Sequence, residues 1–391
     1  MKNIITKLFV GVVCASSLFT TTSCIDETFP TNLITEDQVT SSAKATEALL
    51  WAMPAYLNKY SSYVDTHYDW GYGSIMHIRD VMTGDFAVVS HTYDQYNYWQ
   101  INKYQGNTYI FSQFIWYYYW KLVQTENNVI KAIDPATATE PLLGYLGAAQ
   151  AFRAMTYLDM AQMFEFLPND VTSSINASGN DVLNLTVPIV RETITEEEAR
   201  NNPRVSRDVM AEFILADLDS AEKNIPYLDL YIKEKTLPHL DVVYGLKARC
   251  YMWLGDYANA KKYARLAIDE TSVEPMDSTA CINHQSGFNQ LNKWMWGSQM
   301  VKEEDVVQTG ILNWTAWASN EAVYGYAGAG PMNMIDAKMY NRFNDTDFRK
   351  QMFKAPAGHP LSGSEAYVDL EHAKKIPTYG SLKFRPNAGN G

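Results

Sequence analysis

Cysteine, long apolar runs and positive charge are all scarce in this chain of 391 residues. Four cysteines are too few for a fold held together by disulfides. Beyond the first 23 residues, no apolar run approaches the roughly 20 residues that a membrane-spanning helix needs. The 32 lysines and arginines are outnumbered by 44 aspartates and glutamates, and the net charge of −12 argues against nucleic acid or anionic lipid as a partner.

Motifs of the common enzyme classes are absent as well. The chain has no Walker A loop, no H-E-x-x-H, no C-x-x-C and no G-x-S-x-G. His67, His77 and His91 lack the spacing of a helical metal site. Residues 344–347 faintly resemble a calcium loop, but they lack its glycine and distal glutamate, so a solvated turn is the better interpretation. We therefore expect no enzymatic activity, no metal and no cofactor.

Residues 1–23 have the pattern of a secretion signal. Two lysines precede an apolar run over residues 8–19, and small residues follow it. As a helix the run would be about 18 Å long, which is too short for a hydrocarbon core of about 30 Å. Cleavage after residue 23 would remove two lysines and no acid, and would change the net charge from −12 to −14.

Residues 21–24, Thr-Thr-Ser-Cys, resemble a lipobox, the site at which lipoprotein signal peptidase cuts before an acylated cysteine. Cys24 is therefore expected to be the lipidated first residue of the mature chain, and its acyl chains would give a stable anchor. Asp26 and Glu27 are similar to the acidic signal that sends such lipoproteins to the cell surface. An ordinary secreted protein with a chance cysteine is the alternative.

The strongest periodic pattern after the signal is helical. Apolar residues recur every three or four positions, which is the period of an amphipathic helix and not of a strand. Pro135, Pro168 and Pro226 are expected to end three of these helices. The expected helices cover residues 42–60, 109–134, 142–166, 206–225, 241–254 and 257–269.

Residues 241–269 resemble a tetratricopeptide repeat, in which small residues let paired helices approach and a glycine turn reverses the chain. Lys247 and Ala264 depart from the repeat, which usually has leucine and an aromatic residue at these positions. A single repeat cannot bury its own apolar face, so neighbouring helix pairs are required. The matching positions are Tyr244, Ala248, Tyr251, Gly255, Asp256, Tyr257, Ala260 and Ala267.

Three long segments interrupt the expected helices: residues 61–105, 169–203 and 271–330. They are rich in glycine, asparagine, serine and aromatic residues. Connections in compact helical arrays are usually short, so we expect these loop excursions to carry function.

Aromatic residues make up 13% of the chain and cluster in two of these excursions. A pyranose ring needs a flat aromatic ring beneath its C–H face and amide or carboxylate partners at its hydroxyl rim. The alternative for any one ring is a place in the core of an irregular subdomain, and Trp116 and Trp120 are expected to be core. The candidate ligand-binding residues are Tyr68, Asp69, Trp70, Tyr96, Asn97, Trp99, Asn313, Trp314 and Trp317.

The order and spacing of several segments resemble those of the SusD/RagB family of nutrient-binding lipoproteins. Two departures are the Phe-Glu-Phe at residues 164–166, where Phe-Gly is commoner, and the length, since family members run well past 391 residues. We therefore expect a C-terminal portion to be missing. The segments that carry the resemblance are residues 78–85, 116–133, 147–168 and 246–264.

The resemblance implies a mainly α fold: one domain over residues 24–391 that forms a tetratricopeptide-like superhelix with long, aromatic-rich loop excursions. It also implies an outer-membrane protein, anchored at the cell surface through Cys24. Such a protein captures glycans or oligosaccharides and serves as a lid on a SusC-type TonB-dependent transporter. The sequence leaves two alternatives open: the ligand is a peptide or another nutrient, or the repeats scaffold another protein and bind no small ligand.

Overall fold

The computed structural model describes residues 43–90, 95–283, 285–288, 290–309, 320–321, 332–365, 367 and 369–385. By its internal contacts the chain divides into two units, Met1–Ala45 and Thr46–Gly391, and the architecture below is that of the second. The longer helices are α3 (Ala43–Tyr56), α4 (Tyr72–Thr83), α6 (Ile110–Lys131), α7 (Glu140–Phe164), α9 (Arg207–Tyr231), α10 (Leu240–Leu254) and α11 (Tyr257–Glu270). The shorter elements are β1 (Phe86–Val88), α5 (Asn97–Gln100), α8 (Glu196–Arg200), α12 (Ser278–Ile282), η1 (Leu291–Lys293), α13 (Asp305–Gln308), β2 (Asn333–Ile335), α15 (Ala337–Arg342), η3 (Phe348–Met352) and α16 (Leu370–Ala373).

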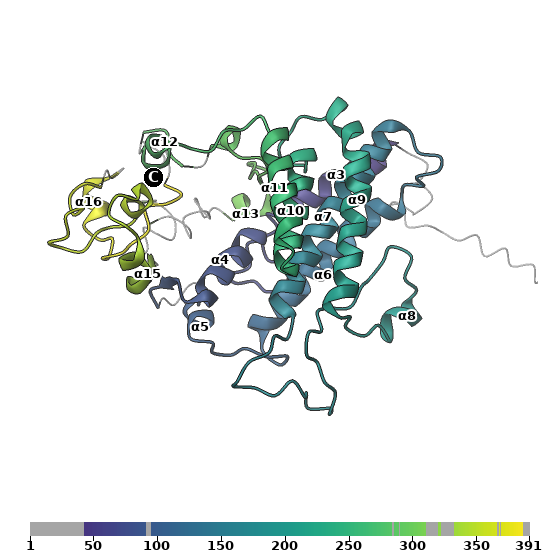
Figure 1. Cartoon of the computed structure of the whole chain (residues 1–391), viewed down its shortest axis with the longest axis horizontal. Coiled ribbons are helices and arrows are strands. Elements are labelled where there is room, and N and C mark those ends of the chain that lie inside the picture. The colour runs from purple at the N-terminus through teal and green to yellow at the C-terminus, as the bar shows by residue number, and fades with distance from the viewer. Residues whose placement is uncertain are drawn as a thin grey trace, which may run out of the picture. The chain divides into compact units, whose positions relative to one another are not determined.

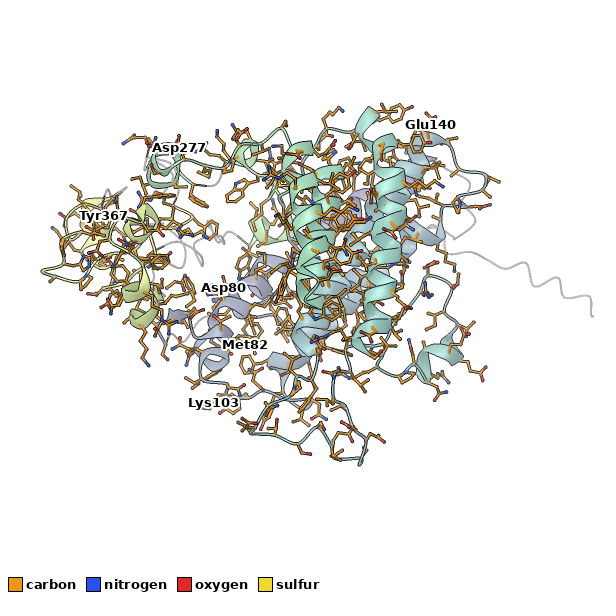
Figure 2. The ribbon with its side chains drawn as sticks, viewed as in Figure 1. Asp80, Met82, Lys103, Glu140, Asp277 and Tyr367 are labelled. Atoms are coloured by element: carbon orange, nitrogen blue, oxygen red, sulfur yellow. The ribbon has the colours of Figure 1, made fainter. Side chains whose placement is uncertain are left out.

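Five long helices, α6, α7, α9, α10 and α11, pack against one another in chain order (Figure 1), and the contact between α7 and α9 is the most extensive. Side chains fill the space between them (Figure 2). Each begins within two residues of the position that the periodicity predicts. The prediction of a mainly α fold with packed helix pairs is confirmed. No described helix is long and apolar enough to cross a membrane.

Helix α9 corrects one predicted boundary. It was expected to end before Pro226, but it continues through the proline to Tyr231. Ile225 and Leu228, on either side of the proline, are fully buried. Gly144 and Gly147 of α7 lie directly against this part of α9. Burial of this apolar turn against α7 offsets the hydrogen bond that proline cannot donate.

Helices α10 and α11 form the unit that resembles a tetratricopeptide repeat. Gly255 ends α10 in the left-handed conformation with φ of 76°, and Asp256 caps α11 by accepting a hydrogen bond from the Asn259 backbone N–H at 3.0 Å. Ala248 and Ala260 are buried at the positions where small residues were expected. The predicted turn and small-residue positions are confirmed.

The ion pairs of Lys247 explain why a lysine stands where the repeat usually has leucine. Its side chain is buried on α10, yet its ammonium lies 2.6 Å from the Asp219 carboxylate and also pairs with Glu222. Both acids belong to α9, so the lysine joins α10 to α9 where a repeat would use leucine. A buried cation is tolerated because it is paired.

Arg153 of α7 joins three parts of the chain. Its Nε and Nη2 donate to both oxygens of Asp217 on α9, at 2.7 and 2.8 Å, in the bidentate geometry that strengthens such pairs. Its Nη1 donates to Glu192 at 2.6 Å and to the Asn127 side-chain oxygen of α6 at 2.8 Å. The guanidinium is buried, and these contacts hold α6, α9 and the excursion before α8 on α7.

The excursion over residues 61–105 has more regular structure than the sequence predicts, because it contains α4, β1 and α5. The helical pattern of α4 is obscured by Gly71 and Gly73 at its start. Gly71 has φ of 92°, and a Cβ there would lie 2.2 Å from the Leu57 carbonyl oxygen, so the position requires glycine. Strand β1 pairs antiparallel with β2, with Phe86 opposite Ile335.

Replacing Gly144 by alanine should lower the melting temperature. An added Cβ would lie 2.5 Å from the Leu228 backbone nitrogen, so α7 and α9 would have to separate. Such overpacking typically costs about 1–3 kcal/mol. The matched control is Gly245→Ala on α10, where an added Cβ meets nothing within 4 Å and should stabilise by about 0.5–1 kcal/mol. Equal melting temperatures for the two variants would contradict the close approach.

Glu126 should make stability fall as pH rises. It is fully buried on α6, it accepts a hydrogen bond from Thr156 at 2.6 Å, and its Oε2 has no partner among the described residues. Burial raises the pKa of Glu126 to about 8. The unfolded chain ionises above its ordinary value near 4.5 while the folded chain stays protonated, so stability is lost as pH rises from about 4.5 to 8.

The variant Glu126→Gln should therefore gain stability over the wild type with rising pH, by at most about 1.4 kcal/mol per pH unit, in denaturant unfolding at pH 5, 6, 7 and 8. The exposed Glu212→Gln on α9 is the control and should follow the wild type. A constant difference between Glu126→Gln and the wild type over this range would show that the carboxyl does not titrate abnormally.

Candidate functional site

The segment before α4 is organised by a buried carboxylate. Asp69 accepts hydrogen bonds from the backbone N–H groups of Tyr63 at 2.7 Å and Val64 at 2.9 Å, and from the Ser62 hydroxyl at 2.8 Å. The residue is fully buried. Its oxygens are used to close the loop, so Asp69 is a structural residue here and not a partner for a sugar hydroxyl.

Tyr96 connects α5 to α4 through its hydroxyl. The oxygen accepts a hydrogen bond from Trp70 Nε1 at 2.8 Å and lies 2.8 Å from the Ser74 hydroxyl. The ring of His77 packs edge-on against Tyr96, with centroids 4.5 Å apart. Burial lowers the pKa of His77 to about 3, so the imidazole is neutral and acts as a packing ring.

Tyr68 and Trp99 form the centre of an aromatic cluster that extends to α6. Their rings meet edge to face at 5.1 Å and 79°. Phe111 lies 4.9 Å from Trp99, and Phe114 lies 5.4 Å from Tyr68. Edge-to-face contacts of this kind are each worth about 0.5–1.5 kcal/mol beyond burial.

These positions correct the expectation that Tyr68, Trp70, Tyr96 and Trp99 offer their rings to a ligand. Each is only 0–4% exposed, so the rings pack against one another instead. The physical reason is that the cluster satisfies the Trp70 indole N–H internally and buries the ring faces. The alternative interpretation, the core of an irregular subdomain, describes these four residues.

The remaining candidates have different positions. Asn97, at the start of α5, is half-exposed. Asn313, Trp314 and Trp317 lie outside the described residues, as does Cys24, and their roles stay predictions. Of the nine candidate ligand-binding residues, the structure brings five together as core and leaves Asn97 near the surface.

Above the buried cluster lies an exposed group of side chains that we call the tyrosine platform: Tyr98, Lys103, Tyr104 and Tyr109. Tyr104 and Tyr109 are 41% and 44% exposed, with ring centroids 5.7 Å apart. Tyr98 meets Tyr104 edge to face at 5.3 Å. The ammonium of Lys103, a residue labelled in Figure 2, lies 5.2 Å from the Tyr98 ring and 4.6 Å from the Tyr104 ring.

The loop that carries the platform is held in an unusual backbone conformation. Asn102 and Tyr104 have φ of 50° and 56°, a left-handed conformation that costs a non-glycine residue free energy. Side chains fix the loop: Ser112 Oγ accepts from the Gly106 N–H at 2.9 Å, and the Gln113 amide donates to the Asn107 carbonyl oxygen at 2.9 Å. The platform is therefore presented by an ordered loop.

A buried carboxylate joins the site segment to the helices by ion pairs. Asp159 of α7 is fully buried and binds Arg79 of α4 at 3.1 Å and Arg249 of α10 at 3.0 Å. The Tyr72 hydroxyl also donates to Asp159. These contacts fix α4, and with it the cluster below the platform, to α7 and α10.

The sequence patterns do not single out Tyr98, Tyr104 and Tyr109, which lie in or just after the aromatic-rich excursion over residues 61–105. Predicting a short helix over residues 97–100 would have separated the exposed rings from the buried ones. Tyr96 and Trp99 are three apart and share the buried face of α5, whereas Tyr98 points elsewhere.

Among the described residues, no group of three or more histidine, cysteine, aspartate or glutamate side chains is placed to hold a metal ion. In the turn over residues 344–347, Asp345 pairs with Lys350 at 2.6 Å and Asp347 pairs with Arg349 at 2.6 Å. These carboxylates bind cationic side chains, as expected of a solvated turn.

No family model and no curated protein matches this chain. Several solved structures, however, do match this chain. A SusD-like carbohydrate binding protein from Bacteroides vulgatus superposes with a TM-score of 0.61 at 19% identity, over 84% of this chain and 66% of that one. A putative sugar binding protein from the same species gives 0.60 at 17% identity, over 89% and 68%. A SusD superfamily protein from Bacteroides fragilis gives 0.58 at 20% identity, over 81% and 68%.

The chain has the SusD fold. The predicted resemblance is confirmed at the level of architecture, that of a mainly helical structure with packed helix pairs. The chain spans about two thirds of the length of the SusD structures that it matches.

Proposed function

We propose that this chain is a cell-surface glycan-binding lipoprotein that captures oligosaccharides for a SusC-type TonB-dependent transporter. The tyrosine platform carries the proposal, because it places exposed rings beside a cation and short polar side chains on a SusD fold. Two similar structures are described as carbohydrate binding and sugar binding proteins, which supports a sugar as the ligand.

The platform suits weak capture of a sugar. Each ring contact contributes about 0.5–1.5 kcal/mol, so Tyr104 and Tyr109 together give modest affinity. The Lys103 ammonium and the side chains of Asn97 and Asn107 would bind hydroxyl groups at the sugar's rim. Asn313, Trp314 and Trp317 are proposed to complete the site. Modest affinity is sufficient for a protein that concentrates ligand at a surface and hands it on.

We propose that the bound ligand is delivered to a transporter, because a binding protein cannot itself carry it across the membrane. Capture without catalysis or transport has value only if the ligand passes to a pore. We propose that the lipidated Cys24 holds the protein at the outer membrane, where it acts as a lid on the transporter. A long-lived complex of this kind typically buries more than about 2,000 Å².

Removing the platform rings should weaken glycan binding. We expect Tyr104→Ala and Tyr109→Ala each to weaken affinity roughly 2- to 12-fold, because one ring contact is lost in each. Affinity electrophoresis against a panel of neutral polysaccharides, followed by calorimetry on the one retained best, measures the loss. Both rings are partly exposed but also contact neighbouring rings, so the melting temperature should fall only slightly.

Tyr231→Ala is the matched control, since Tyr231 is also exposed but lies at the end of α9. It should bind as the wild type does. Retention of the Tyr104→Ala/Tyr109→Ala double variant equal to that of the wild type would remove the platform from the site. Retention of peptides, but of no polysaccharide, would favour the peptide-binding alternative.

Changing Cys24 to alanine should release the protein from the membrane, because the acylated residue is lost. The wild type should fractionate with the outer membrane and be open to protease on intact cells. Extracted in detergent through an affinity tag, it should bring a β-barrel transporter with it. Protection of the wild type until lysis would contradict surface exposure, and purification without any barrel would contradict the lid.

A further inference from the structure

A second concave surface lies along α6, apart from the tyrosine platform. It is a groove of about 510 Å³ between α6 and residues 190–194, within the size range of small-molecule sites. Its α6 wall runs from Tyr117 to Lys131, which is about 21 Å of helix at 1.5 Å per residue. We call it the α6 groove. This length favours an extended ligand over a single small ring.

Two half-buried rings line one wall of the groove. Trp120 is fixed by Trp116, with centroids 5.4 Å apart, and by Tyr157 at 6.2 Å. Tyr117 packs against Tyr63 at 4.7 Å. Among the described residues, neither the Trp120 indole N–H nor the Tyr117 hydroxyl has a hydrogen-bond partner. The wall therefore offers apolar ring surface together with polar atoms that are available to a ligand.

Cations dominate the charge of the groove. Lys121, Lys131 and Arg191 line it, and Glu192 is the one acidic residue among its lining residues. Arg153 already binds that carboxylate at 2.6 Å from below.

Two of these cations, Lys121 and Arg191, form no salt bridge within the described chain, although Arg191 still interacts at longer range with the Glu192 and Asp217 carboxylates. Within the described chain, no carboxylate lies within 4 Å of the charged nitrogen atoms of Lys121 or Arg191. Lys121 donates to the Gln124 side-chain oxygen at 3.1 Å, and the Arg191 guanidinium lies 4.7 Å from the Phe213 ring. On a chain with a net charge of −12, a concave surface lined by three cationic residues and one acid favours an anion.

Ring surface, unpaired donors and excess positive charge together fit one ligand class. We infer that the α6 groove binds an acidic oligosaccharide, in which pyranose rings carry carboxylate or sulfate groups. The rings Tyr117 and Trp120 contact the C–H faces of the sugar, Asn128 binds its hydroxyls, and Lys121 and Arg191 pair with its acidic groups. A neutral glycan would leave the two cations without a salt bridge. This site does not depend on the tyrosine platform.

Calorimetry on the full mature chain tests the inference with three ligands of similar length: an oligogalacturonate for carboxylate, a sulfated galactan oligosaccharide for sulfate, and a neutral maltooligosaccharide. At least one acidic oligosaccharide should bind, with an affinity that falls as salt rises. The double variant Lys121→Gln/Arg191→Gln should bind it at least tenfold more weakly. The matched control Lys223→Gln, an exposed lysine on α9, should bind it as the wild type does.

Three outcomes would overturn the inference: no binding of either acidic oligosaccharide, equal binding to the wild type and the double variant, or equally tight binding of polyglutamate, which has the charge without the sugar. The platform variants Tyr104→Ala and Tyr109→Ala separate the two sites. They should leave acidic binding unchanged, so failure of the platform and failure of the groove are distinguishable.

Discussion

Arg153 is the constraint on which much of the structure depends. A buried guanidinium is costly unless its N–H groups find acceptors, and here they come from α6, α9 and the excursion before α8. All three segments must therefore be in register on α7 at the same time. Two of the acceptors, Asn127 and Glu192, also line the α6 groove. The interaction that organises the helices thus also shapes a concave surface on them.

The site segment is built in two layers on this helical body. The lower layer is the buried cluster of Tyr68, Trp70, Tyr96 and Trp99, whose rings pack against one another and in which the Trp70 indole N–H donates to the Tyr96 hydroxyl. The upper layer is the tyrosine platform, on a loop held by Ser112 and Gln113 at the start of α6. Side chains that are ordered before a ligand arrives lose less freedom on binding, which would favour the sugar binding proposed for the platform.

The sequence predicts the helices well because apolar periodicity reports directly on which face of a helix is buried. It predicts α10 and α11 best, where small residues and a glycine turn fall in a known pattern. Composition does not report how deeply a side chain is buried, however. Tyr96 and Tyr98 therefore look alike in the sequence, although Tyr96 is buried and Tyr98 is partly exposed. Helix α4 and the continuation of α9 past Pro226 depend on tertiary contacts, namely the approach of Gly71 to Leu57 and of Leu228 to Gly144, which local pattern does not contain.

Lys247 limits how this chain could change over time. Substitution by the leucine usual in a tetratricopeptide repeat would leave Asp219 and Glu222, three residues apart on α9, facing each other without their shared cation. Replacing the acids first would instead strand a buried ammonium. Loss of Asp219 and Glu222 is therefore disfavoured for as long as Lys247 is present, whereas replacing Lys247 first leaves the two acids 71% and 36% exposed to solvent.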